Sequence, residues 1–421
     1  MTQRIFNVML FSSHTKFVVW GFTLSRAYRL FFLLFEQSFI ANPFQREGFF
    51  WLVSHFSYLT GKRSIQMELV KDLLAAISGV LNGLPQGLLA MTFGFASVPT
   101  AIAFIIGAFG NTITSNVAVI SFQAETITVA GTMGRNIKER LSMIFYGALI
   151  MLVIGLFGLM ETIITWIGPI ITNGMMAGVG IMLSKVAWDM SRNDRIVGIS
   201  SLVSALIVYM ATQDLVYTIT ISVILSSVIY YFTGKDKGGV TENIKEDKFK
   251  LQKLPLTPMV IRGALAMACL NVGANIAFGK INADIADSAV NVDTITIISS
   301  IADMASALFG GGPVEVVISA TASAPHAVLA GVIMMVIMAI ILFLKLLPKI
   351  GKYVPSASIV GFLFVLGAIV TLPGSAEAAL MGDASSNLVG AMTMVVTAIA
   401  DPFLGMLAGI IMQFLLSIFG I

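Results

Sequence analysis

The sequence predicts an all-α protein that crosses a membrane many times. Hydrophobic residues make up 57% of its 421 residues and charged residues only 11%, whereas a soluble domain carries about a quarter charged residues. Apolar runs separated by short polar breaks continue from residue 72 to the end of the chain. Several runs are too short to cross as full helices, because a spanning helix needs about 20 residues. We therefore expect a multi-pass protein of the cell membrane in which some elements are interrupted.

The apolar runs give about 14 elements, each with the composition of a membrane segment. They are 72–92, 96–114, 117–133, 141–160, 162–184, 196–212, 215–232, 258–279, 287–308, 313–324, 326–346, 354–372, 386–400 and 402–420. The short runs 117–133 and 313–324 take the third place in each set of seven. This spacing predicts two sets of seven elements related as an inverted repeat, in which elements 3 and 10 correspond.

The polar loop after the seventh element divides the chain into two halves. We expect a first repeat over 67–233, a connecting loop over 234–257 and a second, inverted repeat over 258–421. Segments of the two halves are also alike, since Leu156–Met182 resembles Leu344–Gly367 in its Gly and Pro spacing. Inverted repeats with matching interrupted segments indicate a secondary transporter whose site lies near the bilayer midplane.

Element 10 contains the sequence feature that is most unusual for a membrane helix. Gly310, Gly311, Gly312 and Pro313 interrupt a helix, and freed backbone groups survive at membrane depth only inside protein or beside a cavity. Glu315 follows two residues later, where an ionisable group is costly and typical of a functional site. A broken helix next to an acid predicts a substrate site at this place.

The starts of elements 3 and 10 are rich in β-branched residues. Val117–Ser121 and Val314–Ser319 therefore favour short extended strands, which could pair across the pseudo-two-fold axis. We expect each strand to lead into a half-helix. The N-terminal amides of such half-helices would face the site and favour anionic or acceptor groups.

Several short segments resemble the nucleobase–ascorbate transporter family, the xanthine/uracil permeases, and within it the azaguanine-like guanine/hypoxanthine permeases. The similar segments are Ile301–Pro313, Asn116–Ser121 and Asn271-Val272-Gly273. The resemblance extends over about residues 70–421. Two departures stand out, because Leu270 and Ser319 occupy the positions of the family's two signature acids. Glu315 lies four residues before Ser319 and would share its face in a helix.

The resemblance implies a fold and a function for the chain. It implies fourteen spans with a core of elements 1–4 and 8–11 and a gate of elements 5–7 and 12–14. It also implies a secondary active permease for purine-type nucleobases, such as guanine, hypoxanthine or xanthine, or for uracil, which works by alternating access and forms a possible homodimer. A proton is the expected coupling ion, and no other cofactor is expected.

Polar residues near the two breaks are the candidates for substrate binding or coupling. They are Glu315, Ser319, Asn271, Glu125, Asn275, Gln123, Asn116 and Thr321. Asn271 and Asn275 lie four apart on one helix face, and they could equally join helices. Glu125 could equally face the loop that contains Arg135. Asp303, together with the glycines and Pro313, is expected to hold the broken segment in a structural role.

Other function classes find little support in the sequence. There is no phosphate-binding Gly-rich loop and no Ser/His/Asp arrangement, so we expect no enzyme. The single Cys269 and the scattered His14, His55 and His326 predict no metal site. We expect a small molecule and the lipid bilayer as partners, and no nucleic acid. Two alternatives to the nucleobase permease stay open, namely an anion transporter of the same fold, for sulfate or a carboxylate, and a membrane scaffold without transport.

Residues 1–66 differ from the rest of the chain. They hold seven Lys and Arg residues against two Glu residues, and their most apolar stretch, Phe17–Phe39, contains two Arg residues. They are either a basic aromatic extension on the membrane surface or not part of the native protein, which would then begin at Met67. Orientation also stays open, because the positive-inside rule places Arg135–Arg140 in the cytoplasm whereas the resemblance implies that both chain ends lie there.

Overall fold

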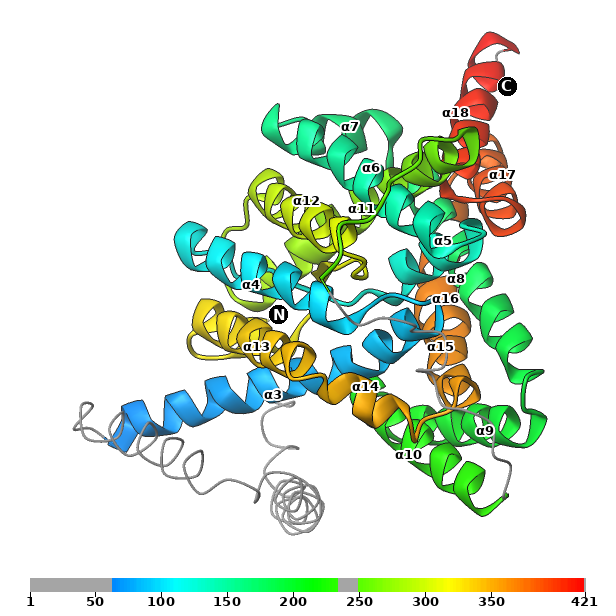
Figure 1. Ribbon diagram of the computed structural model, residues 1–421. Coiled ribbons are helices and arrows are strands. Elements are labelled where there is room, and N and C mark those ends of the chain that lie inside the picture. The colour runs from blue at the N-terminus through cyan, green and yellow to red at the C-terminus, as the bar shows by residue number, and fades with distance from the viewer. Residues whose placement is uncertain (1–62, 234–248, 420–421) are drawn as a thin grey trace, which may run out of the picture. The chain divides into compact units, whose positions relative to one another are not determined.

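The computed structural model describes residues 63–233 and 249–419 (Figure 1). The chain divides into two compact units, Met1–Met67 and Glu68–Ile421. Apart from the first residues of α3, every element named here lies in the second unit. The expectations for residues 1–66 fall almost wholly outside the described residues, as does most of the loop 234–257.

The described part of the chain is almost entirely helical and contains two short strands. The elements of the first half are α3 (Arg63–Thr92), α4 (Ser97–Thr114), β1 (Val119–Ser121), α5 (Ala124–Met133), α6 (Ile137–Leu156), α7 (Met160–Ile167), α8 (Pro169–Ser191), α9 (Arg195–Thr212) and α10 (Leu215–Phe232). Those of the second half are α11 (Pro258–Ile285), α12 (Val292–Leu308), β2 (Glu315–Val317), η2 (Ala320–Ser323), α13 (Ala327–Phe343), α14 (Leu346–Gly351), η3 (Ser356–Ile359), α15 (Val360–Val365), η4 (Leu366–Thr371), α16 (Leu372–Leu380), α17 (Ala384–Ile399) and α18 (Pro402–Phe419).

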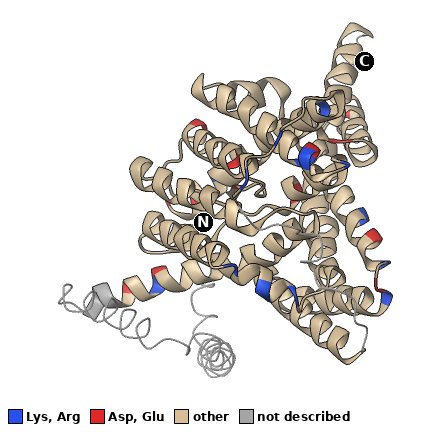
Figure 2. Ribbon diagram, in the orientation of Figure 1, with Lys and Arg blue, Asp and Glu red and all other residues tan. Residues whose placement is uncertain are grey.

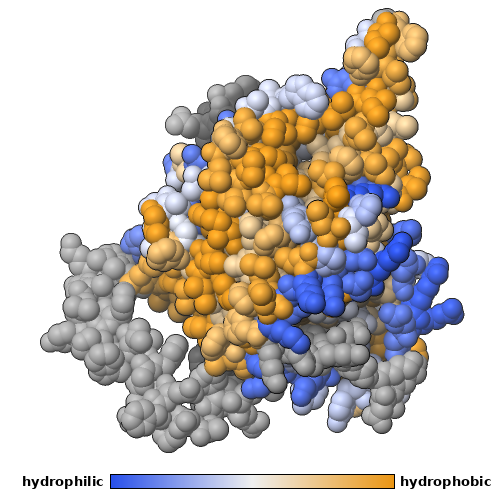
Figure 3. Space-filling view, turned by 45° about the horizontal axis from the view of Figure 1, so that its top comes forward, coloured by the Kyte–Doolittle hydropathy of each residue, from blue (hydrophilic) through white to orange (hydrophobic). Residues whose placement is uncertain are grey.

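The chain is a multi-pass membrane protein. Nine helical segments of the described residues are long and apolar enough to cross a bilayer. Large apolar side chains are exposed along them, among them Phe109, Ile207 and Phe414 at 63% to 69% exposure. The face in Figure 3 is accordingly apolar over most of its area, and charged residues are few along the ribbon in Figure 2. The count of fourteen elements in two inverted sets of seven stays a prediction.

One expected span proves to be two helices. The sequence predicted a single element over 162–184, but the chain breaks at Gly168, whose φ of 84° lies in the left-handed region. Pro169 then starts α8, because its fixed φ suits the first turn of a helix and its missing N–H costs no bond there. The short helix α7 therefore precedes a full-length α8.

The second interrupted element also differs from its prediction. Element 3 contains the expected half-helix, α5, but element 10 contains only the single 3₁₀ turn η2. Pro325 explains the difference, because it disfavours helical geometry at the residue before it. Ala324 is indeed extended, with φ −74° and ψ 151°.

Helices from both halves surround the two strands. α4 packs against α12 and α13, and α6 packs against α11 and α12 (Figure 1). α11, α12 and β1 all contact β2. Elements 3 and 10 therefore meet inside a group of helices, where an unpaired strand edge would be tolerated only in contact with protein.

Candidate functional site

The two interrupted elements meet through their strands. β1 and β2 pair antiparallel, with Val119 opposite Val317, Ile120 opposite Val316 and Ser121 opposite Glu315. All of these residues except Val317 are buried. Directly opposite residues on paired strands point to the same face, so the side chains of Ser121 and Glu315 are neighbours.

The glycine-rich break before β2 is held by hydrogen bonds to other elements. Gly310 adopts a φ of 98°, which only glycine takes readily. Its carbonyl accepts a hydrogen bond of 2.9 Å from the amide of Ala96, and Gly311 forms a parallel bridge with the same residue. The amide of Gly312 donates to Thr100 Oγ1 at 2.8 Å. The break is therefore a fixed backbone feature that aligns β2.

Asp303 is tied to the first residue after this break. Its Oδ1 accepts a 2.6 Å hydrogen bond from the amide of Val314, which gives Asp303 the position that a structural role requires. Its Oδ2 is buried and receives no hydrogen bond from a donor group of the described residues. The carboxyl group of Glu315 is a neighbour of the Asp303 carboxyl group.

Glu315 lies at the centre of the candidate site and is 3% exposed. Asn271 and Asn275 of α11 both donate side-chain hydrogen bonds to its carboxylate, the one from Asn275 Nδ2 to Oε2 at 3.5 Å. Within the described residues, Glu315 and Asp303 take part in no ion pair. A buried charge is normally paired, so a central acid without a cation is unusual.

A chain of side-chain contacts connects α5 to this acid. Gln123 precedes α5 and donates from Nε2 to the carbonyl of Val316 in β2 at 3.3 Å. The hydroxyl of Thr126 contacts Gln123 Oε1 and also lies 3.2 Å from Asn271 Oδ1. Gln123, Thr126, Asn271, Glu315 and Asn275 therefore form one connected cluster, which we call the polar cluster.

The N-terminus of α5 adjoins the polar cluster. No side chain caps this helix end, and its first intrahelical bond runs from the amide of Ile127 to the carbonyl of Gln123. The amides of the first turn therefore have no intrahelical partner, and the helix dipole adds partial positive charge there. Glu125 lies in the same turn and is 6% exposed.

Three other candidates from the sequence have local contacts instead. Asn116 follows α4, and its Oδ1 accepts from the amide of Ala118 at 3.0 Å. Ser319 Oγ accepts from the amide and the hydroxyl of Thr321, at 3.2 Å and 2.9 Å, and so caps η2. None of these contacts reaches the polar cluster.

Two residues near the site were absent from the sequence-based candidates. Thr126 bridges Gln123 and Asn271, and its signal was its place three residues after Gln123 in a predicted helix. Ser121 faces Glu315, and its buried Oγ has no hydrogen-bond partner among the described residues. Only the strand register could have revealed Ser121.

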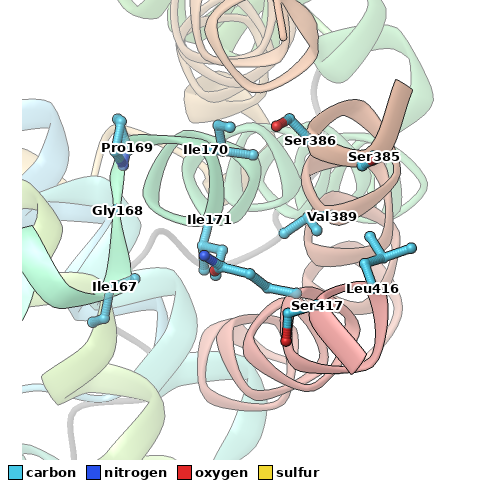
Figure 4. A pocket seen from close by; sticks show the side chains of 11 residues that line it. Ile167, Gly168, Pro169, Ile170, Ile171, Ser385, Ser386, Val389, Leu416 and Ser417 are labelled. Carbon is cyan, nitrogen blue, oxygen red and sulfur yellow. The ribbon is translucent and has the colours of Figure 1, made fainter. Parts of the chain in front are cut away.

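A separate pocket lies between other helices. It has a volume of about 340 Å³ and is lined by the end of α7 and by α8, α17 and α18, with mainly apolar residues and no charged side chain (Figure 4). We place the candidate site at the polar cluster instead, because the cluster contains buried ionisable and amide groups. No group of three or more His, Cys, Asp or Glu residues within the described ranges could hold a metal ion.

Comparison with solved structures shows which proteins share this fold. No protein-family model and no curated protein matches the chain. Among solved structures, the transmembrane domain of a cyanobacterium bicarbonate transporter, BicA, is similar with a TM-score of 0.63 and 15% identity, over 82% of this chain and 97% of that one. SLC26A9 is similar with a TM-score of 0.62 and 14% identity, over 92% of this chain and 71% of that one. The murine anion transporter Slc26a9 in its inward-facing state gives a TM-score of 0.64 and 14% identity, over 92% and 75%.

These similarities correct the resemblance drawn from the sequence. The chain has the fold of the BicA and SLC26A9 transporters, and the suspected membership of the nucleobase–ascorbate transporter family is wrong. The quoted segments are Gly-rich breaks and β-branched runs. Such segments are typical of interrupted membrane helices whatever the substrate. They therefore predicted the broken helices but did not identify the family.

Proposed function

We propose that the chain is a secondary active transporter of a small anion, such as bicarbonate, sulfate or a carboxylate, and that protons accompany the anion. It would act as a carrier and not as an enzyme. The solved structures of similar fold include a bicarbonate transporter and an anion transporter, which supports this substrate class over a nucleobase. A homodimer stays a prediction.

The observation that carries the proposal is the burial of Glu315 without a cation in a fold shared with anion transporters. An ionised carboxylate repels an anion, and the repulsion is strong at low effective dielectric constant. A proton on the acid removes this repulsion. The site therefore suits an anion only when its acid is neutral, which couples anion binding to proton uptake.

The open end of α5 supplies the attraction that an anion needs. Backbone amides at a helix N-terminus bind anions directly, and the dipole favours negative charge there. The amide nitrogen of Gln123 and the hydroxyl of Ser121 lie next to this helix end and add donors. The single turn of η2 is too short to offer a second helix N-terminus, so the binding site is asymmetric between the two halves.

Uptake into proteoliposomes tests the proposal. We expect purified protein to accumulate labelled sulfate, or labelled bicarbonate at constant pH, and an inward proton gradient to stimulate sulfate uptake. A protonophore should remove the stimulation, and empty liposomes serve as the control. If the protein accumulates labelled hypoxanthine but neither sulfate nor bicarbonate, the proposed substrate class is wrong. Uptake of none of the three compounds would favour the scaffold alternative.

A further inference from the structure

The two buried acids beside the break are in contact with each other. Asp303 is 1% exposed and Glu315 is 3% exposed. One oxygen of Asp303 accepts from the amide of Val314, the residue before Glu315, and the other is buried with no hydrogen-bond donor among the described residues. The carboxyl groups of Asp303 and Glu315 interact with each other. Asn275 Oδ1, which is fully buried, likewise has no partner among the described residues. Two acceptor oxygens in contact inside a protein require a hydrogen between them.

Among the residues that the structure describes, no positive charge next to the pair compensates it. The nearest groups are the amides of Asn271 and Asn275 on α11, the hydroxyls of Ser121 on β1 and Ser299 on α12, and, on α5, the acid Glu125. The other charged residues of the elements packed against α12 and β2 lie within two turns of helix ends, and α4 has none. They are Lys138, Glu139 and Arg140 on α6, Glu161 on α7, Arg262, Lys280 and Asp284 on α11, and Asp293 on α12.

Two buried carboxyl groups that interact directly do not both ionise, because each disfavours the charged form of the other. We propose that Asp303 and Glu315 share one proton in the empty site, and that a second proton taken up by the pair accompanies each transported anion. This inference rests on the proposed function and deepens it. Asp303 then belongs to the coupling machinery, in addition to holding the break.

The charge balance of the cycle follows from the pair. With one shared proton the pair has a charge of −1, and with two it is neutral. A proton from water on one side forms an O–H bond on the pair as the anion binds. The same bond breaks on the other side as the anion leaves, and no electrons are exchanged. A neutral pair next to the N-terminus of α5 accepts an anion, whereas a charged pair repels it.

Isosteric amide substitutions separate this arrangement from a single coupling acid. Asp303→Asn keeps an oxygen for the amide of Val314 and can donate its own amide hydrogen to Glu315, so the break stays held. Glu315→Gln keeps the size of the side chain. Each single variant retains one titratable group that can still carry one proton. The double variant retains none.

The test measures sulfate uptake against pH, proton-gradient stimulation, and exchange of labelled for unlabelled sulfate in proteoliposomes. We expect each single variant to stay proton-stimulated while the pH of half-maximal uptake moves by about one unit or more. We expect the double variant to exchange sulfate but to lose all stimulation. Exchange shows that a variant is folded. If the double variant does not exchange, infrared spectra of the single variants decide, because each must lose the signature of the shared proton.

Three outcomes would overturn the inference. A wild-type pH profile in Asp303→Asn would show that Asp303 is only structural. Complete loss of stimulation in Glu315→Gln alone would make Glu315 the single coupling acid, and stimulation that persists in the double variant would place coupling elsewhere. Each of these leaves the proposed function intact. Failure of the wild-type protein to take up any anion would instead remove the proposed function itself.

Discussion

Replacement of Gly311 by alanine tests how tightly the break is built. A Cβ at this position would lie 2.3 Å from Ser306 Oγ and 2.6 Å from the backbone nitrogen of Thr100. The serine hydroxyl could rotate, although it would then lose its 2.8 Å hydrogen bond to the carbonyl of Gly312. The nitrogen of Thr100 belongs to α4 and moves only with that helix. Overpacking of this kind costs about 1–3 kcal/mol, so we expect Gly311→Ala to destabilise the fold by this amount.

The neighbouring residue provides a matched control. A Cβ at Gly312 would meet nothing closer than the Cβ of Phe95 at 3.3 Å, so Gly312→Ala should stay much closer to wild type. Unfolding by sodium dodecyl sulfate in mixed micelles, followed by circular dichroism, measures both changes in the free energy of unfolding. Equal stability of Gly311→Ala and wild type would refute the close approach of the break to α4.

Three further outcomes follow from the contacts of single residues. Asn271→Ala removes a hydrogen-bond donor from the buried carboxyl group of Glu315, which costs about 1.5–3 kcal/mol, and it should lower sulfate transport about tenfold or more. Asn116→Ala is the control, because Asn116 has only a local contact, and this variant should transport sulfate normally. Arg262→Ala leaves the fully buried carboxylate of Asp401 without its 2.6 Å ion pair and should lower the melting temperature in detergent, and adding Asp401→Asn to Arg262→Ala should recover part of the loss. Hydrogen bonds from Ser386 lower the pKa of Asp383, which caps α17, below its ordinary 3.8. The ionised carboxylate of Asp383 therefore stabilises the fold at neutral pH, and this stabilisation is lost as the pH falls through the lowered pKa. The melting temperature of Asp383→Ala should be below that of wild type at pH 7 and should approach it in strong acid.

Local chemistry made the broken elements predictable. Gly310–Pro313 cannot continue a helix, and β-branched residues follow, so an extended strand at this position required no knowledge of the rest of the fold. Gly168-Pro169 carried an equally clear signal of a helix boundary. A length criterion alone merged the end of α7 with most of α8, because the stretch 162–184 is apolar and is by itself about as long as one span.

The contacts of the site depended on register, which the sequence does not contain. Alignment of the two halves matches Ser121 with Ser319, but antiparallel pairing reverses the order and places Ser121 opposite Glu315. Likewise Asp303 was expected to hold the break, while its contact with Glu315 depends on how α12 packs against β2. Side chains that meet across elements are fixed by packing, so single-sequence reasoning found the members of the polar cluster more readily than their partners.

Under the proposed function, protonation and not the number of acids decides whether the site accepts an anion. The open N-terminus of α5 contributes the equivalent of roughly half a positive charge, which screens at most part of one carboxylate. Glu125, Asp303 and Glu315 are all buried near this end or beside the break, and no ion pair among the described residues reaches them. If all three were ionised, the site would repel every anion, in conflict with the anion substrate that we propose. The conflict disappears when the acids hold protons, since the helix end then becomes the dominant local charge. Under the proposed function, coupling to protons is thus a consequence of placing an anion site among uncompensated acids.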